Sequence, residues 1–185
     1  MNEKNLYIIA GCNGAGKTTA SFTILPEILD CKEFVNADEM AKGLSPFQPE
    51  KVAFESGRIM LNRIDELFQN QENFAFETTL ASKTYKHKVN KAKADGYSVT
   101  LLFFWLKDSD LAKERVKVRV REGRRYLNGI KNLFEIYIDM VEQTLIFDNS
   151  DGKPVLIAEK NFAENIIIHN LDKFNSLKKV YDERC

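Results

Sequence analysis

A glycine-rich segment near the N-terminus, GCNGAGKT at residues 11–18, constrains the fold of this chain more than any other feature. It matches the pattern GxxxxGK(S/T) completely, and it follows a short apolar run, LYIIA at residues 6–10, that is typical of a strand buried on both faces. We therefore predict a phosphate-binding loop between a strand and a helix. A glycine-rich turn before an ordinary helix is the less favoured alternative.

Each residue type in this loop has a physical reason to be there. Glycines allow backbone angles and a close approach that side chains would block, so that main-chain N–H groups point inward at phosphate oxygens. Lys17 supplies positive charge for the β- and γ-phosphates, and the Thr18 hydroxyl is placed to bind Mg²⁺. Cys12 is most simply a small spacer. The residues that we expect to bind ATP are Gly11, Asn13, Gly14, Ala15, Gly16, Lys17, Thr18 and Thr19.

The rest of the chain alternates between strand-like and helix-like segments. Apolar runs of strand length recur at residues 33–36, 73–76, 99–106 and 144–147. Between them we expect helices at residues 49–69 and 82–94, another that begins at residues 108–110 and ends at 121, and one at 126–142. The tail is expected to add strands at 154–159 and 165–169 and a helix from residue 171. This alternation predicts a single α/β domain, residues 1–185, with a mainly parallel central sheet.

Composition narrows the range of partners and compartments. Lysine plus arginine equals aspartate plus glutamate at 27 each, so no broad positive field favours a nucleic-acid partner. Cys12, Cys31 and Cys185 are odd in number and lack CxxC spacing, which argues against a disulfide framework or a zinc site. The N-terminus has no signal-peptide core, and no apolar run approaches transmembrane length. We expect a cytoplasmic protein with no membrane or nucleic-acid partner.

Two carboxylates follow strand-like runs and are candidates for chemistry beside the loop. Asp38 comes after the run at residues 33–36, and Glu77 comes directly after Phe76. Because the carboxyl ends of parallel strands share one edge of a sheet, both side chains should lie near the loop. Phosphoryl transfer needs a group that takes the proton of the acceptor hydroxyl. Asp38 could equally be a helix N-cap, and a structural hydrogen-bonding role is the alternative for Glu77.

Four motifs in order, GCNGAGKTT, FVNADEMAKGLSP, FAFETTL and LAKERVKVRVREG, resemble the zeta toxin family of P-loop kinases, most closely its chromosomal branch. The resemblance implies a kinase-like P-loop NTPase fold with three α/β/α layers. It also implies transfer of the γ-phosphate of ATP, with Mg²⁺, to a hydroxyl of a small-molecule acceptor. Nucleotide sugars such as UDP-N-acetylglucosamine are the substrate class that it implies, and an antitoxin protein is a candidate partner.

The resemblance also assigns roles to individual residues. Lys17 matches the catalytic lysine of the loop, and Asp38 matches the aspartate that takes the acceptor's proton. Glu77 and Thr78 match the position that holds the acceptor. Family members use arginines of a lid against the triphosphate, and the candidates in this chain are Arg115, Arg119 and Arg125.

The chain departs from the family in this lid, at residues 112–128. Similar sequences carry a longer segment between an Arg-Glu-Gly and an Arg-Arg-Tyr, whereas here Gly123 is followed at once by Arg124. Either the lid is shortened in this chain, or lid residues are missing from the sequence at this point. The second alternative predicts Cα atoms of Gly123 and Arg124 well beyond the ~3.8 Å of a bonded pair.

Two further functions remain open from the sequence. A nucleotide-binding regulatory or interaction protein with weak ATPase activity fits a short lid. A nucleoside or nucleotide kinase would need a basic site for the acceptor's phosphate near the second and third strands, whereas Asp38 and Glu77 favour a neutral, hydroxyl-rich acceptor. We expect His87 and His169 to be surface groups rather than ligands.

Overall fold

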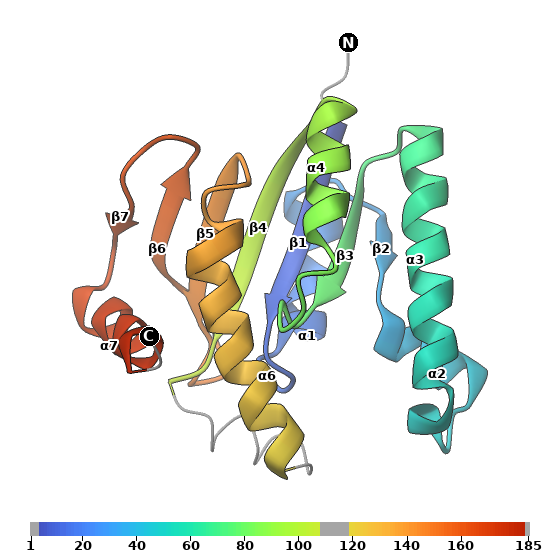
Figure 1. Cartoon of the computed structure of the whole chain (residues 1–185), viewed down its shortest axis with the longest axis horizontal. Coiled ribbons are helices and arrows are strands. Elements are labelled where there is room, and N and C mark those ends of the chain that lie inside the picture. Colours follow the sequence, from blue (N-terminus) through green and yellow to red (C-terminus); the bar gives the residue numbers. More distant parts are fainter. Residues whose placement is uncertain (1–3, 108–118, 184–185) are drawn as a thin grey trace.

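The computed structural model of the chain describes residues 4–107 and 119–183, and side chains in the second range from residue 123 onward. These residues form a seven-stranded sheet of order β2-β3-β1-β4-β5-β6-β7 (Figure 1). The strands from β2 to β5 in that order are parallel, and β6 and β7 pair antiparallel. The strands are β1 (Lys4–Gly11), β2 (Glu33–Val35), β3 (Phe74–Thr78), β4 (Tyr97–Trp105), β5 (Gln143–Asp148), β6 (Val155–Asn161) and β7 (Ile167–Ile168). The mainly parallel sheet predicted from the sequence is confirmed.

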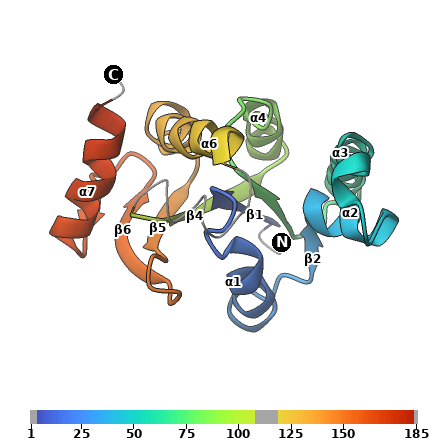
Figure 2. The ribbon, with the colours of Figure 1, turned by 90° about the horizontal axis from the view of Figure 1, so that it is seen from below.

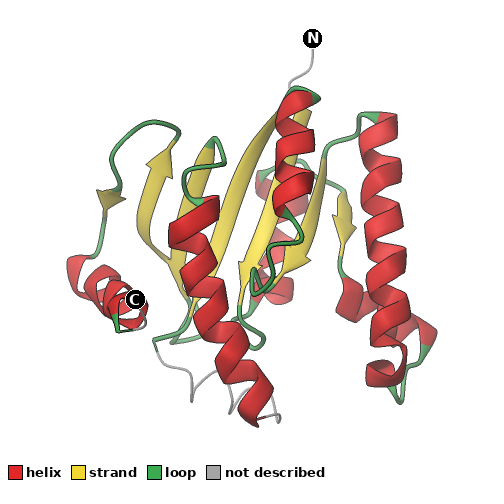
Figure 3. Cartoon of the chain, viewed as in Figure 1, coloured by secondary structure: helices red, strands yellow, loops and turns green. Residues whose placement is uncertain are grey.

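Helices cover both faces of this sheet. The α-helices are α1 (Lys17–Thr23), α2 (Ala37–Leu44), α3 (Ala53–Asn70), α4 (Lys86–Ala94), α6 (Arg119–Asn132) and α7 (Leu171–Asp182). Helices α4 and α6 lie on one face and α1 lies on the other (Figure 2). Helices α2 and α3 flank the β2 edge, and α7 flanks the β6 and β7 side (Figure 3). Shorter helical turns follow α1 (Ile24–Ile28) and α6 (Leu133–Tyr137) and precede α3 (Pro49–Val52). Every helix in the described part of the chain is too short or too polar to cross a membrane.

The central strands are apolar at nearly every position because helices cover both of their faces. Every side chain from Leu6 to Ala10 in β1 is buried, and so are those from Leu101 to Trp105 in β4. The Trp105 ring is closed in by α6, whose Tyr126 hydroxyl accepts a hydrogen bond from Nε1 at 3.0 Å. The same hydroxyl donates to the Leu106 carbonyl at 2.8 Å. The core therefore extends to the end of the strand that lies beside the loop.

One helix replaces the break predicted between residues 121 and 126. Helix α6 runs through Gly123 and Arg124 without interruption, so the chain as given is joined there by regular helix. A glycine inside a helix costs only about 1 kcal/mol. Packing of Tyr126, Ile130 and Leu133 on the sheet at helical spacing outweighs that cost. The helix also ends earlier than predicted, at Asn132 rather than residue 142.

The helix predicted at residues 82–94 begins four residues later, at Lys86. The preceding segment is a series of turns, in which Leu80 has a φ of +53° and the Thr84 N–H donates to the Ser82 hydroxyl at 3.0 Å. Serine and threonine hydroxyls that bond nearby main-chain groups compete with the helix in this way. Gly96, with a φ of +80°, follows the end of α4.

Parallel pairing brings the carboxyl ends of β1, β2 and β3 to one edge of the sheet. In the register, Ile9 of β1 lies beside Glu77 of β3, and Val35 of β2 lies beside Phe76. The residue after β2, Asn36, is therefore carried next to Glu77, and the loop after β1 starts on the other side of Glu77. These three connections build the site described next.

Candidate active site

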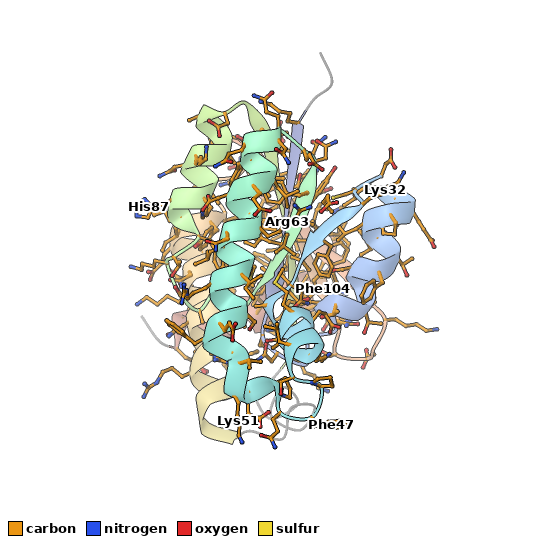
Figure 4. All side chains as sticks on the ribbon, turned by 90° about the vertical axis from the view of Figure 1, so that its right-hand side faces the viewer. Lys32, Phe47, Lys51, Arg63, His87 and Phe104 are labelled. Atoms are coloured by element: carbon orange, nitrogen blue, oxygen red, sulfur yellow. The ribbon has the colours of Figure 1, made fainter. Side chains whose placement is uncertain are left out.

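The loop between β1 and α1 has a backbone that glycine adopts without strain. Gly11, Gly14 and Gly16 have φ values of +137°, +79° and +77°. Gly11 also lies against β4, where a Cβ atom would come 2.2 Å from the carbonyl oxygen of Phe104. Figure 4 shows Phe104 inside the molecule, between the layers. Positive φ angles therefore explain why these positions are glycine, and at Gly11 the closeness of the neighbouring strand is a second reason.

Lys17 is the first residue of α1, and it is folded back over this loop. Its side chain is only 4% exposed. The Nζ atom donates to the Cys12 carbonyl oxygen at 2.9 Å and lies 3.3 Å from Oε1 of Glu77. A buried ammonium group requires such partners, because an unpaired charge away from water is strongly unfavourable. The loop therefore encloses one cation, and Glu77 balances it.

Glu77 lies within β3, which extends one residue beyond it, rather than after the strand as predicted. Its second oxygen, Oε2, accepts hydrogen bonds from the Thr18 hydroxyl at 2.7 Å and from Nδ2 of Asn36 at 2.9 Å. Together with Lys17, these contacts saturate a carboxylate that is 10% exposed. Glu77 therefore joins the ends of β1, β2 and β3 into one polar cluster.

The donor set at Thr18 suits a magnesium ion. The Thr18 hydroxyl donates its proton to Glu77, and its oxygen accepts a long hydrogen bond of 3.4 Å from Nδ2 of Asn36. A second lone pair of that oxygen remains for a cation. Mg²⁺ prefers oxygen ligands and is commonly held by a few protein groups together with substrate phosphates. Within residues 4–107 and 119–183, no cluster of three His, Cys, Asp or Glu side chains could hold a metal unaided. A magnesium ion here would rest on Thr18 and on nucleotide phosphates, with Glu77 behind Thr18.

Asn36, and not Asp38, is the N-cap of α2. The Asn36 side-chain oxygen accepts from the main-chain N–H groups of Asp38 at 2.8 Å and Glu39 at 3.3 Å. The capping alternative considered for Asp38 is therefore wrong. Asp38 instead stands in the first turn of the helix with its side chain exposed. In the described parts of the chain its carboxylate makes no hydrogen bond or ion pair, which leaves it able to accept a proton from a substrate.

A cavity of about 700 Å³ connects these residues. It is lined by Asn13 and Lys17 from the loop, by Asp38 from α2, and by Glu77 and Thr78 from β3. The cavity has an apolar side, formed by Phe54, Met60 and Leu61 of α3 with Tyr85 before α4. Besides Lys17, its described lining has three arginines, Arg58 on α3 and Arg124 and Arg125 on α6. One space therefore adjoins the phosphate loop, two carboxylates, an aromatic wall and several arginines.

The other residues predicted for the site differ in where they lie and in whether the structure describes them. Arg125 lines the cavity, whereas Arg115 and the side chain of Arg119 lie outside the described residues, so their roles stay predictions. Thr19 is exposed on α1. The Thr78 hydroxyl, which lines the cavity, also accepts from the Leu80 N–H at 3.1 Å.

The two histidines are surface groups, as expected from the sequence. His87 points outward from α4 (Figure 4), and His169 is exposed with its Nε2 3.0 Å from Oε1 of Glu159.

Several residues of the site escaped prediction from the sequence. Asn36 carries a recognisable signal, since an asparagine directly before a helix is a preferred N-cap. Arg124, beside the predicted Arg125, faces the same cavity. Arg58 lies on a helix that was predicted only to cover the sheet, and its position in the cavity depends on how α3 packs beyond β2. No local pattern in the sequence marks it.

The strand order, the glycine loop and the lysine at the start of α1 define a P-loop protein with a kinase-like fold. The chain belongs to the zeta toxin family, whose model matches residues 2–170. A curated relative, an uncharacterised protein of Haemophilus influenzae, is 25% identical over 129 residues, which cover 69% of this chain and 88% of that protein.

Solved structures share the fold at low sequence identity. One comes from the PezAT chromosomal toxin–antitoxin system of Streptococcus pneumoniae, with a TM-score of 0.65, 14% identity, and coverage of 99% of this chain and 88% of that one. Another is the AvrRxo1-ORF1:ORF2 complex with ATP, with a TM-score of 0.71 and 16% identity. There the match covers 97% of this chain and 64% of the other, so this chain spans less than two thirds of that protein.

Proposed function

We propose that the protein is an ATP-dependent phosphotransferase that moves the γ-phosphoryl group of ATP to a hydroxyl of a small molecule bound in the 700 Å³ cavity. The observation that carries this proposal is the shared lining of that cavity, in which Lys17 of the phosphate loop and Asp38 of α2 face the same space. A phosphate donor and a proton acceptor are thereby held around one position. Membership in the zeta toxin family and the ATP complex of a protein of the same fold support the proposal.

The proposed step balances with the residues at hand. A bond forms between the acceptor oxygen and the γ-phosphorus, and the bond from that phosphorus to the β-phosphate oxygen breaks, which releases ADP. The proton of the acceptor hydroxyl goes to the Asp38 carboxylate. The main-chain N–H groups of the loop and Lys17 hold the phosphates, and Arg125 stands where it can neutralise charge on the transferring group. Magnesium, held by Thr18 and the phosphates, would supply further charge neutralisation when bound.

Glu77 has a different proposed role from the one that the family resemblance assigns. Its carboxylate is occupied by Thr18, Asn36 and Lys17, so direct binding of the acceptor would require one of these contacts to be given up. We propose that Glu77 orients Thr18 and balances Lys17, and that Asp38 and Thr78 face the acceptor. This is the structural hydrogen-bonding role considered for Glu77 as the alternative from the sequence. In this proposal it also positions the groups that bind the nucleotide.

The cavity favours an acceptor with both an apolar ring and anionic groups. Phe54 and Tyr85 offer aromatic surface, and Arg58 and Arg124 offer positive charge on the acceptor side. A nucleotide sugar such as UDP-N-acetylglucosamine has both features and a free hydroxyl, so it is the proposed acceptor class. The same arginines also favour the second candidate function, a nucleotide kinase, over the neutral acceptor expected from Asp38 and Glu77. An antitoxin is the proposed protein partner, on the precedent of the PezAT toxin–antitoxin system.

The test is a transfer assay with labelled ATP, Mg²⁺ and a panel of nucleotide sugars, nucleosides and nucleoside monophosphates. The kinase proposal expects labelled product from one acceptor class with the wild type and none with Lys17→Ala. Label on nucleotide sugars supports the leading function, and label on nucleosides or monophosphates supports the second candidate. Equal transfer by wild type and Lys17→Ala would contradict the mechanism.

A regulatory nucleotide-binding protein would behave differently. ATP in excess should stabilise the folded state by RT ln(1 + [L]/Kd) in either case, so a thermal shift tests binding alone. A shift that is lost in Lys17→Ala, without transfer to any acceptor, would favour the regulatory function over the kinase.

A further inference from the structure

Asn149 connects the end of β5 to the phosphate loop. It is the first residue after β5, it is 5% exposed, and it lies 134 positions along the chain from Ala15. Its Nδ2 donates a hydrogen bond of 2.8 Å to the Ala15 carbonyl oxygen. Ala15 stands in the middle of the loop, between Gly14 and Gly16. A buried side chain from another part of the fold therefore holds one peptide group of the loop.

That peptide group determines where one phosphate-facing donor points. A trans peptide is planar, with its C=O and N–H directed to opposite sides. Fixing the Ala15 carbonyl toward Asn149 therefore directs the Gly16 N–H away from Asn149. The two residues are also in direct contact, because a Cβ atom on Gly16 would lie 2.3 Å from Nδ2 of Asn149. The glycine and the asparagine fit one another as a pair.

Asn149 itself stands on a rigid support. Its main-chain N–H donates to the Trp105 carbonyl at 2.9 Å, which continues the pairing of β5 with β4. The preceding residue, Asp148, is buried, and its carboxylate pairs with Lys173 of α7 at 2.5 Å. The Ser150 N–H donates to the same carboxylate at 3.0 Å. Helix α7 and the end of β5 thus hold the backbone from which Asn149 reaches the loop.

We propose that Asn149 is a positioning residue for the phosphate loop, which orients the Ala15–Gly16 peptide and so sets the affinity for the diphosphate part of a nucleotide. The inference rests on the proposed function, since it takes the loop to be a nucleotide site. It assigns to the segment after β5 a role in binding that the loop motif does not contain. Asn149 acts through Ala15 and does not need to touch the nucleotide.

The experiment compares two buried asparagines that each donate to a main-chain carbonyl. Asn149→Leu keeps the approximate shape of the side chain and removes its hydrogen bond to Ala15. The control, Asn132→Leu, removes a bond of 2.6 Å to the Leu80 carbonyl from an asparagine that is also 5% exposed. Binding of ADP with Mg²⁺ is measured by calorimetry for the wild type and both variants, well below their unfolding temperatures. Urea unfolding of all three reports stability separately.

The inference expects both variants to lose stability and only Asn149→Leu to bind ADP more weakly, by about tenfold. ADP affinity that falls equally in both variants, or is unchanged in Asn149→Leu, would overturn it. If Asn149→Leu does not fold, Asn149→Ala provides the same comparison with a smaller side chain. Wild-type protein that binds no ADP would contradict the proposed function itself. Binding by the wild type with unchanged affinity in Asn149→Leu would contradict only the inference.

Discussion

Lys17 and Glu77 form an ion pair at the carboxyl edge of the sheet, with Nζ 3.3 Å from Oε1 and both side chains largely buried. The pair links the loop after β1 to the neighbouring strand. A bound triphosphate would compete with Glu77 for the ammonium group, because both are anions that face the same cation. Without nucleotide, the Glu77 carboxylate therefore neutralises the charge of Lys17. When phosphates take over that role, the hydrogen bond from Thr18 keeps Glu77 in place.

The first prediction concerns the charge of Glu77. Glu77→Gln removes the negative charge and keeps an oxygen that can accept from Thr18 or Asn36. We expect phosphate transfer to fall ~10- to 100-fold and the Mg²⁺ concentration for half-maximal activity to rise, because the residue behind the metal ligand has changed. ADP affinity without Mg²⁺ should stay the same or improve, because Lys17 is released. A Mg²⁺ dependence equal to that of the wild type would contradict this role.

The second prediction separates the two functions of Asn36. Asn36→Ala removes the cap of α2 and a donor to Glu77, so it should lower stability by about 0.5–2 kcal/mol and also reduce phosphate transfer. Asn170→Ala is the matched control, because Asn170 caps α7 by accepting from the Lys173 N–H at 3.0 Å. Urea unfolding should show comparable losses in both variants. Loss of transfer in the control to the same extent would show that stability alone explains the effect.

Local patterns predicted the strands and the loop, because a parallel sheet makes its central strands continuously apolar and glycine positions follow backbone geometry. The region from residue 121 to 142 was predicted less well. We predicted one helix up to residue 121 and another from residue 126, but the burial of Tyr126, Ile130 and Leu133 favours one continuous helix, and that burial depends on tertiary packing. The start of α4 was misplaced for a related reason, since hydroxyl-bonded turns replaced its first predicted turn.

The residues of the candidate site also fall into two groups, those that local sequence patterns could place and those that tertiary packing places. Lys17, Thr18 and Asp38 come after strands and Glu77 lies near the end of one. The rule that parallel strands end at one edge was enough to place these residues together. Asn149 and Arg58 could not be found in this way. Their positions depend on which strand pairs with β4 and on how α3 packs beyond β2, and neither is encoded by residues near them in sequence.

The third prediction concerns acid stability. Burial alone would raise the pKa of Asp148, but hydrogen bonds from Lys173 and Ser150 outweigh it, and the net pKa is lowered from 3.8. A carboxyl group whose folded-state pKa is lowered stabilises the fold above its unfolded pKa, and this stabilisation is lost as the pH falls through the folded value. Asp148→Asn should therefore be less stable than the wild type at pH 7, by roughly 1.5–3 kcal/mol.

This stability difference should shrink as the pH falls below about 3.8, the ordinary pKa that Asp148 has in the unfolded chain, toward the lowered pKa of the folded carboxyl group. Urea unfolding of both proteins between pH 7 and pH 2.5 measures it. The control is Asp172→Asn, which changes an exposed carboxylate beside Lys173 in the first turn of α7. This variant should differ little from the wild type in stability at any pH. A difference for Asp148→Asn that does not change with pH would contradict the assigned ion pair.

The fourth prediction concerns the thiols. Burial raises the pKa of Cys31 to about 11, so at pH 8 this group is almost entirely the unreactive thiol. We expect iodoacetamide at pH 8 to leave Cys31 unmodified in the folded protein and to modify it readily in urea, as read by peptide mass spectrometry. Rapid modification in the folded state would show that the segment between α1 and β2 opens easily.

The most direct test of the central claim is phosphate transfer by wild type and Asp38→Asn, with ADP affinity measured for both. The claim is that Lys17 and Asp38 serve one reaction across one cavity. The account predicts that wild-type protein with ATP and Mg²⁺ makes UDP-N-acetylglucosamine heavier by one phosphate. In Asp38→Asn that rate should fall ~10²- to 10⁴-fold while ADP affinity is unchanged. Equal rates of product formation in the two proteins would contradict the account.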